Sequence, residues 1–179
     1  MSLAQKKILK SSHKLRASVQ ALGCRLNQYE GQSIEGKLRS KGYEIVPFGE
    51  DANLGVINTC TVTNEADAKS RNVIRRFSRK NPDAITVVVG CYSQTSANEV
   101  AMVEGVDYVI GNHDKMNFLD YLGEQKPASP VVIRERIDRS DFSMGHVGEV
   151  HFEQRANLKI QDGCDFMCSF CVIPFARGR

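Results

Sequence analysis

The chain has 179 residues, of which 41% are hydrophobic and 25% charged, and its net charge of +3 is ordinary for a soluble globular protein. This length permits one domain with a packed core, or one domain and part of another. No apolar stretch approaches the roughly 20 residues of a membrane-spanning helix, and the N-terminus lacks the apolar run of a secretory signal. We therefore expect a cytoplasmic protein with no membrane partner, whose six cysteines are reduced thiols or metal ligands.

Residues 1–16 form a basic segment at the start of the chain. No acidic residue occurs before Glu30, whereas six lysines and arginines do. We interpret residues 1–16 as a disordered basic arm that precedes the first folded domain.

From residue 17 to residue 125, short apolar runs alternate with longer amphipathic ones. The pattern predicts strands at residues 17–22, 43–48, 54–58, 85–89 and 106–110, and helices at residues 29–41, 64–80, 96–104 and 114–122. Residues 86–89, Thr-Val-Val-Val, are β-branched without interruption, as expected of a strand buried on both faces of a parallel sheet. The alternation predicts an α/β domain with an open, mostly parallel sheet and flanking helices.

Six basic side chains gather in the predicted helix at residues 64–80. They are Lys69, Arg71, Arg75, Arg76, Arg79 and Lys80. Such a cluster suits contact with nucleic-acid phosphates. It is equally typical of a solvated helix face, and charge alone does not decide between the two.

Three cysteines share one position relative to the predicted strands. Cys24, Cys60 and Cys91 each lie at the carboxyl end of a strand, where open parallel sheets bind their ligands. Each cysteine alone is more typical of a small buried residue, but the shared placement favours three ligands of one metal site. We expect Gly23 and Gly90 to leave room for an inorganic cofactor close to the backbone.

The composition of the sequence changes after residue 125. Proline, glycine and charged residues predict a linker at residues 126–152, and residues 153–179 then begin a second domain with a strand at 156–160. Cys164, Cys168 and Cys171 follow in a C-x3-C-x2-C pattern. Three thiolates from one loop can hold three irons of a [4Fe–4S] cluster and leave the fourth iron open to a substrate or cofactor.

Other metals and functions compete with this interpretation. Structural zinc usually requires four ligands, commonly in C-x2-C pairs, and neither trio of cysteines supplies a fourth. His113 and His151 lie at no familiar spacing, and we assign them no role. An iron–sulfur carrier normally needs four cysteines for each cluster. Such a carrier, and a zinc-stabilised RNA-binding module that uses residues 69–80, remain the alternatives from other functional classes.

Several motifs resemble those of known enzymes. Residues 164–171, Cys-Asp-Phe-Met-Cys-Ser-Phe-Cys, resemble the signature of radical S-adenosylmethionine (SAM) enzymes. Residues 22–30, 58–64, 89–91 and 173–179 resemble the methylthiotransferases of that superfamily. The strings around Cys24 and Cys60 look most like the branch that acts on threonylcarbamoyladenosine in tRNA. The other branches act on isopentenyl-type adenosines in tRNA or on an aspartate of a ribosomal protein.

The resemblance implies two [4Fe–4S] clusters, one on each trio of cysteines. The cluster on Cys164, Cys168 and Cys171 would bind SAM and cleave it to a radical that abstracts hydrogen from C2 of the modified adenine beside the anticodon. The cluster on Cys24, Cys60 and Cys91 would deliver the methylthio sulfur. The implied partners are tRNA, SAM and an electron donor. No acid–base catalytic residue is expected, because this C–H is not acidic and the difficult chemistry belongs to the cofactors.

The resemblance also suggests roles for residues beside the cysteines. Phe170 precedes the last cysteine of the loop and would contact the SAM adenine; ordinary packing within the loop is the alternative. Asn27 and Asn58 flank the first two cysteines, where turn or capping roles are the default and hydrogen bonds to cluster sulfur the alternative.

The chain ends eight residues after Cys171, short of the barrel found in radical-SAM enzymes. We therefore expect an N-terminal fragment that is inactive by itself. In such a fragment, residues 1–125 fold independently and the residues after about 150 are poorly anchored.

Overall fold

A computed structural model describes residues 14–137 and 159–179 of the chain. The predicted basic arm, residues 1–16, lies outside these ranges except at its end, where Arg16 already belongs to the first strand. Most of the predicted linker, residues 126–152, also lies outside the described residues.

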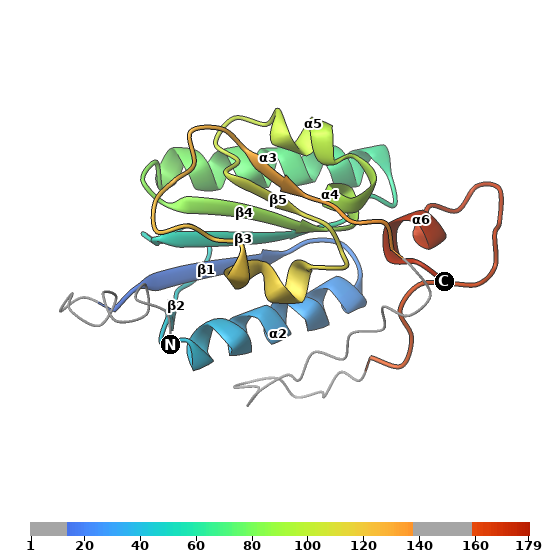
Figure 1. The fold of residues 1–179 in the computed structure, drawn as a ribbon, viewed down its shortest axis with the longest axis horizontal. Helices are drawn as coiled ribbons and strands as arrows, with labels where there is room; N and C mark the ends of the chain where they lie inside the picture. The colour runs from blue at the N-terminus through green and yellow to red at the C-terminus, as the bar shows by residue number, and fades with distance from the viewer. Residues whose placement is uncertain (1–13, 138–158) are drawn as a thin grey trace.

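Within the described residues, six strands form one open sheet, and every neighbouring pair of strands is parallel (Figure 1). Their spatial order is β2 (Glu44–Ile45), β1 (Arg16–Ala21), β3 (Leu54–Thr59), β4 (Ile85–Gly90), β5 (Tyr108–Ile110) and β6 (Val131–Ile133). The central strands β3 and β4 are buried almost throughout, as the β-branched run predicts. The predicted open, mostly parallel α/β sheet is confirmed.

Helices cover both faces of the sheet. The helix α2 (Arg25–Ser40) and the 3₁₀ helix η1 (Lys115–Asp120) lie on one face, and α3 (Asn64–Lys80) and α5 (Ala97–Ala101) lie on the other (Figure 1). The helix α3 begins where expected, since the Thr63 hydroxyl accepts the N–H of Ala66 at 3.1 Å and caps the first turn. No helix in the described part of the chain is long and apolar enough to cross a membrane.

The two faces of the sheet have separate hydrophobic cores. On one face, Ile34 and Leu38 of α2 join Phe118 of η1. On the other, Val73, Ile74 and Val100 of α3 and α5 pack over the sheet. Neighbouring residues of one strand point to opposite faces, so the central strands feed both cores and need an unbroken apolar run.

The peripheral elements differ from the sequence prediction. The strand predicted at residues 43–48 is only two residues long. The helix predicted at 96–104 is the shorter α5, and a further short helix, α4 (Cys91–Thr95), precedes it where none was predicted. The strand predicted at 156–160 lies mostly outside the described residues, and its last two residues form no strand. Because β6 pairs with β5, the sheet continues past residue 125 into the range predicted as linker.

The C-terminal segment, residues 159–179, lies at the carboxyl ends of the strands (Figure 1). Its short helix α6 (Ile173–Arg177) packs against α4, and Ala176 is fully buried. The side chain of Arg177 is only 3% exposed. The expectation that residues after about 150 are poorly anchored is therefore wrong for this segment, because a buried arginine and a helix contact hold it to the sheet domain.

Candidate metal centre

The chain reverses its direction across the sheet between β1 and β3. From β1 it passes through α2 to β2 on one side, and from β3 it passes through α3 to β4 on the other. The loops that leave β1 and β3 therefore diverge, and open α/β sheets bind their ligands in the crevice that such a divergence leaves. The first two predicted ligands lie at this point.

The three strand-end cysteines lie at one edge of the sheet. Cys24 is the N-cap residue of α2 and is exposed, whereas Cys60 directly follows β3 and Cys91 directly follows β4, and both of these are buried. The register pairs Ala21 with Asn58 and Thr59 with Gly90, so three adjacent strands end side by side. The predicted placement at the carboxyl ends is observed, and the role of these thiols as ligands stays a prediction.

The glycines beside these cysteines serve a different purpose from the one predicted. Gly23 has φ = 86°, and a Cβ there would lie 2.6 Å from Cys60 Sγ. Gly90 has φ = 100°, and a Cβ there would lie 2.5 Å from Asn58 Oδ1. The space next to each glycine is thus filled by the neighbouring strand-end loop, and glycine is needed for the close packing of the loops.

The second trio of cysteines lies on a loop whose two ends are bonded together. The N–H of Cys164 donates to Gly178 O at 3.0 Å, and Gly163, at φ = 72°, approaches the same carbonyl so closely that a Cβ would lie 2.3 Å from it. Within the loop, the N–H of Cys171 donates to Cys168 O at 3.0 Å. Phe170 is 92% exposed, which disfavours a packing role and leaves its contact with SAM a prediction.

Neither trio is drawn together around a common point. Among residues 14–137 and 159–179, no three cysteine, histidine, aspartate or glutamate side chains are grouped closely enough to hold a metal ion. All six cysteines are free thiols, and thiolates are the usual ligands of iron–sulfur clusters, so the donor chemistry of both sets fits such a cluster.

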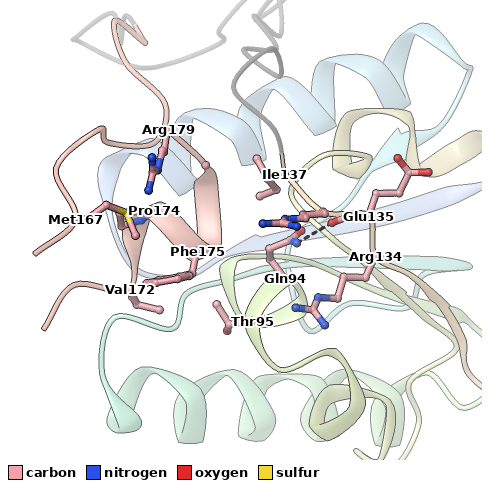
Figure 2. A pocket seen from close by; sticks show the side chains of 12 residues that line it. Gln94, Thr95, Arg134, Glu135, Ile137, Met167, Val172, Pro174, Phe175 and Arg179 are labelled. Carbon is pink, nitrogen blue, oxygen red and sulfur yellow. Dashed lines mark hydrogen bonds between the residues drawn. The ribbon is translucent and has the colours of Figure 1, made fainter. Parts of the chain in front are cut away.

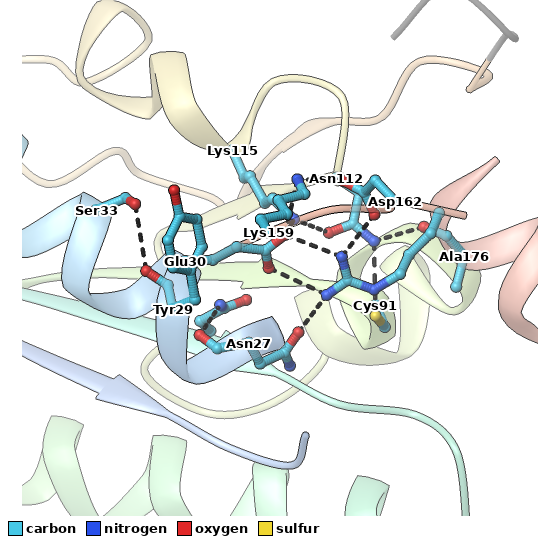
Figure 3. Close-up of polar contacts among 12 residues, drawn as sticks. Asn27, Tyr29, Glu30, Ser33, Cys91, Asn112, Lys115, Lys159, Asp162 and Ala176 are labelled. Carbon is cyan, nitrogen blue, oxygen red and sulfur yellow. Dashed lines mark hydrogen bonds and ion pairs between the residues drawn. The ribbon is translucent and has the colours of Figure 1, made fainter. Parts of the chain in front are cut away.

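A buried ionic cluster lies beside Cys91, one of the strand-end cysteines (Figure 3). Glu30 of α2 is fully buried and is paired with Lys115 Nζ at 2.6 Å, with Arg177 at 2.9 and 3.0 Å, and with Lys159 Nζ at 3.6 Å. Asp162 accepts a hydrogen bond from Arg177 at 2.8 Å. Three segments that are distant in sequence, α2, η1 and the C-terminal segment, therefore meet at one carboxylate.

The neighbouring cations decide the charge state of Glu30. Burial alone would raise the pKa of this carboxyl, but Lys115 and Arg177 outweigh burial and lower the pKa to about 2. Burial lowers the pKa of Lys115, and its attraction to Glu30 opposes that change. Glu30 is thus ionised at neutral pH, as its pairing requires.

Two asparagines connect the ionic cluster to the cysteines. Asn27 Nδ2 donates to Leu22 O and to Thr59 O, both at 2.8 Å, and so ties the loop after β1 to the end of β3. Asn112 Nδ2 donates to Cys91 Sγ at 3.7 Å. Burial raises the pKa of the Cys91 thiol, and Arg177 and Asn112 act in the opposite direction. The default turn role for Asn27 is replaced by a buried bridge between two loops.

A cavity of about 1240 Å³ opens between the C-terminal segment and the end of the sheet domain (Figure 2). Its walls carry the arginines Arg134, Arg136 and Arg179 and the apolar side chains of Met167 and Phe175. The cavity therefore adjoins the loop of Cys164, Cys168 and Cys171 and combines cationic with apolar groups.

Sequence reasoning missed the ionic cluster. Lys115 lies 85 residues after Glu30 (115 − 30), and Arg177 lies 147 residues after it. A lone charged residue carries no local sign that it is buried. One signal was available: Asn27 and Glu30 are three residues apart on a helix, so their side chains share one face.

The fold and the thiol-bearing strand ends define an open parallel α/β domain with a candidate metal site at its topological switch point. The chain belongs to the uncharacterized protein family UPF0004, whose model matches residues 16–111.

Individual relatives match more of the chain than the family model does. The chain is 43% identical over 163 residues to the threonylcarbamoyladenosine tRNA methylthiotransferase MtaB of Bacillus subtilis, covering 88% of this chain and 35% of the relative. It is 41% identical over 168 residues to the MtaB of Aquifex aeolicus, covering 92% of this chain and 41% of the relative. The ribosomal protein uS12 methylthiotransferase RimO of Chloroflexus aurantiacus is 27% identical over 180 residues, covering 92% of this chain and 40% of the relative. The resemblance to methylthiotransferases, and to the threonylcarbamoyladenosine branch among them, is confirmed.

Proposed function

We propose that the protein takes part in adding a methylthio group to C2 of threonylcarbamoyladenosine, next to the anticodon of tRNA, by radical-SAM chemistry. The observation that carries this proposal is the 43% identity to the Bacillus subtilis methylthiotransferase over 88% of this chain. The chain spans 35% and 41% of the length of the two relatives named MtaB, so the activity of the whole enzyme is proposed for the protein that contains this sequence.

Two sets of thiols would hold the cofactors. Cys164, Cys168 and Cys171 would hold the [4Fe–4S] cluster that binds SAM, and Cys24, Cys60 and Cys91 would hold a second cluster. The clusters and SAM, when bound, supply the electron, the radical and the sulfur that an unactivated C–H position requires.

The chain's own side chains would bind and orient these groups. The exposed ring of Phe170 has a free face for stacking on the SAM adenine. Asn112 donates a hydrogen bond to Cys91 Sγ and would help to orient that thiol. The closed base of the loop limits the freedom of its three cysteines.

The tRNA would meet two features of the described residues. The helix α3 presents a row of basic side chains, including exposed Lys69, Arg76 and Arg79, that suit phosphate contacts. The cavity beside the loop offers arginines for phosphate and the Phe175 ring for stacking with a base. The same chemistry would require an electron donor, and the proposed site of action is the cytoplasm.

Metal analysis tests the two sites. After anaerobic reconstitution with iron and sulfide, we expect about eight irons per chain, and about four when Cys24, Cys60 and Cys91 are replaced by alanine. The matched variant, with Cys164, Cys168 and Cys171 replaced, should also retain about four. Zinc in place of iron would support the RNA-binding module and refute the proposal.

Nucleoside analysis tests the substrate. In cells whose gene carries Cys60→Ala, mass spectrometry of tRNA nucleosides should show threonylcarbamoyladenosine without its methylthio group. Loss of the methylthio group from isopentenyl-type adenosine, or from the ribosomal-protein aspartate, would assign the protein to one of the other two branches. An unchanged set of modifications would contradict all three.

A further inference from the structure

The ionic cluster around Glu30 is bonded both to the loops at the strand ends and to the C-terminal segment that carries the second trio of cysteines. On the side of the sheet, Asn27 donates to the carbonyl of Leu22, two residues before Cys24, and to that of Thr59, directly before Cys60. Asn112 donates to Cys91 Sγ itself. One buried asparagine thus bonds to the backbone just before Cys24 and Cys60, and the other bonds to Cys91 itself.

On the side of the loop, the contacts come from three consecutive residues. The guanidinium of Arg177 donates to Asn27 Oδ1 and makes two hydrogen bonds to Glu30, at 2.9 and 3.0 Å. The carbonyl of Ala176 accepts from Asn112 Nδ2. The carbonyl of Gly178 accepts from the N–H of Cys164 at 3.0 Å. The two asparagines that bond to the strand-end loops and to Cys91 thus also bond to Ala176 and Arg177, at the base of the cysteine loop.

Lys115 closes the network from a further element. Its Nζ donates to Asn112 Oδ1 at 2.9 Å and pairs with Glu30 Oε1 at 2.6 Å, and its side chain is 1% exposed. Asn112 is therefore connected to Asn27 through Lys115, Glu30 and Arg177 in turn (Figure 3).

The composition of this network favours a positioning role over a purely stabilising one. Buried ion pairs contribute little net stability compared with apolar side chains of similar size, and fixing one arrangement among several is their best-attested use. The guanidinium is planar and makes hydrogen bonds in a fixed fork, so it orients the groups it joins more strictly than an ammonium would.

We propose that Arg177 is a positioning residue that, through Glu30 and Asn27, fixes the loop of Cys164, Cys168 and Cys171 in place against Cys24, Cys60 and Cys91. This inference rests on the proposed function for its purpose, since two cofactor sites that act on one substrate must keep a set separation. The contacts that carry it belong to the chain itself.

Hydrogen exchange and alkylation of the metal-free chain test the proposal. In Arg177→Met, amides of residues 163–178 should exchange about tenfold faster or more, and buried Cys60 and Cys91 should be alkylated correspondingly faster, each followed by mass spectrometry of its peptide. The matched control is Arg179→Met, which removes an exposed arginine two residues away and should leave both rates unchanged.

A second variant separates positioning from stability. The triple variant Glu30→Met, Lys115→Met and Arg177→Met replaces the charges with apolar side chains and leaves Lys159 paired with Asp162. We expect its melting temperature to return toward that of the wild type while exchange of the loop and alkylation of Cys91 stay fast. Wild-type rates in the triple variant would show that Arg177 serves stability alone and would overturn the proposal.

A third variant covers the case in which Arg177→Met does not fold. Arg177→Lys keeps the charge but loses the fork, so its loop should exchange at a rate between those of the wild type and the triple variant. Wild-type exchange and alkylation in Arg177→Lys would also overturn the proposal. Because these measurements use no metal, failure of the chain to bind iron would refute the proposed function and leave this result independent.

Discussion

Glu30 shows how one side chain can depend on several distant ones. Its carboxylate is fully buried and paired with lysines and an arginine from η1, α6 and the segment before the cysteine loop. A buried charge that loses one partner is left uncompensated, which typically costs about 3–5 kcal/mol. Removing one partner of an exposed ion pair, such as Arg16 with Glu50, would cost about 1 kcal/mol or less.

The low pKa of Glu30 predicts a loss of stability in acid. The pKa is about 2 in the folded protein and 4.5 ordinarily, so the unfolded chain takes up a proton first as the pH falls. The contribution of about 3 kcal/mol is complete above pH 4.5 and is lost as the pH falls toward 2. Lys115, Lys159 and Arg177 are the cations that face Glu30, and Asp162 is the other carboxylate of the cluster.

Urea unfolding of the wild type and of Glu30→Gln measures this contribution. The difference in unfolding free energy between the two proteins should be smaller at pH 3 than at pH 6, by about 2 kcal/mol. Carboxyl groups outside the cluster keep the same surroundings in both proteins, so their contributions largely cancel in the difference. A difference that does not change with pH would contradict the assigned pKa.

At the scale of elements, α3 combines an apolar stripe with a basic face. Val73, Ile74 and Phe77 face the core. The guanidinium of Arg76 lies 5.1 Å from the centre of the ring of half-buried Phe48. Lys80 pairs with Asp51 at 3.1 Å. Lys69 and Arg79 are exposed on the same helix, and they extend the basic face along its length.

The basic face of α3 should contribute to tRNA binding in a salt-dependent way. Replacing Lys69 and Arg79 by glutamine should weaken tRNA binding at low salt and reduce the slope of log K against log salt by about 1.5 for two lost phosphate contacts. The matched control replaces Arg39 and Lys41, two exposed basic residues at the end of α2 on the opposite face of the sheet. Equal effects of the two pairs on a binding titration would indicate nonspecific attraction by net charge.

At the scale of the whole molecule, features that depend on neighbouring residues could be predicted from the sequence, and features that depend on long-range contacts could not. The β-branched run at residues 86–89 and the cap at Thr63 are local signals, and both elements form where expected. The position of Cys60 and Cys91 follows directly from the ends of β3 and β4. Sheet class and cysteine placement could therefore be read from neighbouring residues alone.

Other features depend on contacts that no local pattern reports. The strand β6 is only three residues long and follows a proline- and serine-containing break, so its pairing with β5 is set by tertiary contact. The docking of residues 159–179 depends on Arg177 meeting Glu30 across 147 residues. Gly23 and Gly90 could be recognised as special, but the loops that fill their surroundings come from neighbouring strands.

The extent of the sheet domain can be tested by truncation. Both hydrophobic cores lie within residues 17–133, so a variant that ends at residue 137 should unfold cooperatively. A variant that ends at residue 125 loses β6 and the packing of Ile133, and should melt at a temperature lower by several degrees, for a loss of about 1–2 kcal/mol. Equal melting temperatures in thermal denaturation would show that β6 adds nothing to the domain.

The close approach of Gly163 to the carbonyl of Gly178 holds the two ends of the cysteine loop together. A free segment must give up chain entropy when three of its residues gather around a metal, and this cost comes out of the binding free energy. Here contacts within the chain itself bring the ends of the segment together. Metal binding at the proposed cluster site would then have to order only the side chains and the short stretches between them, so the proposed binding of iron would be coupled to the docking of the C-terminal segment.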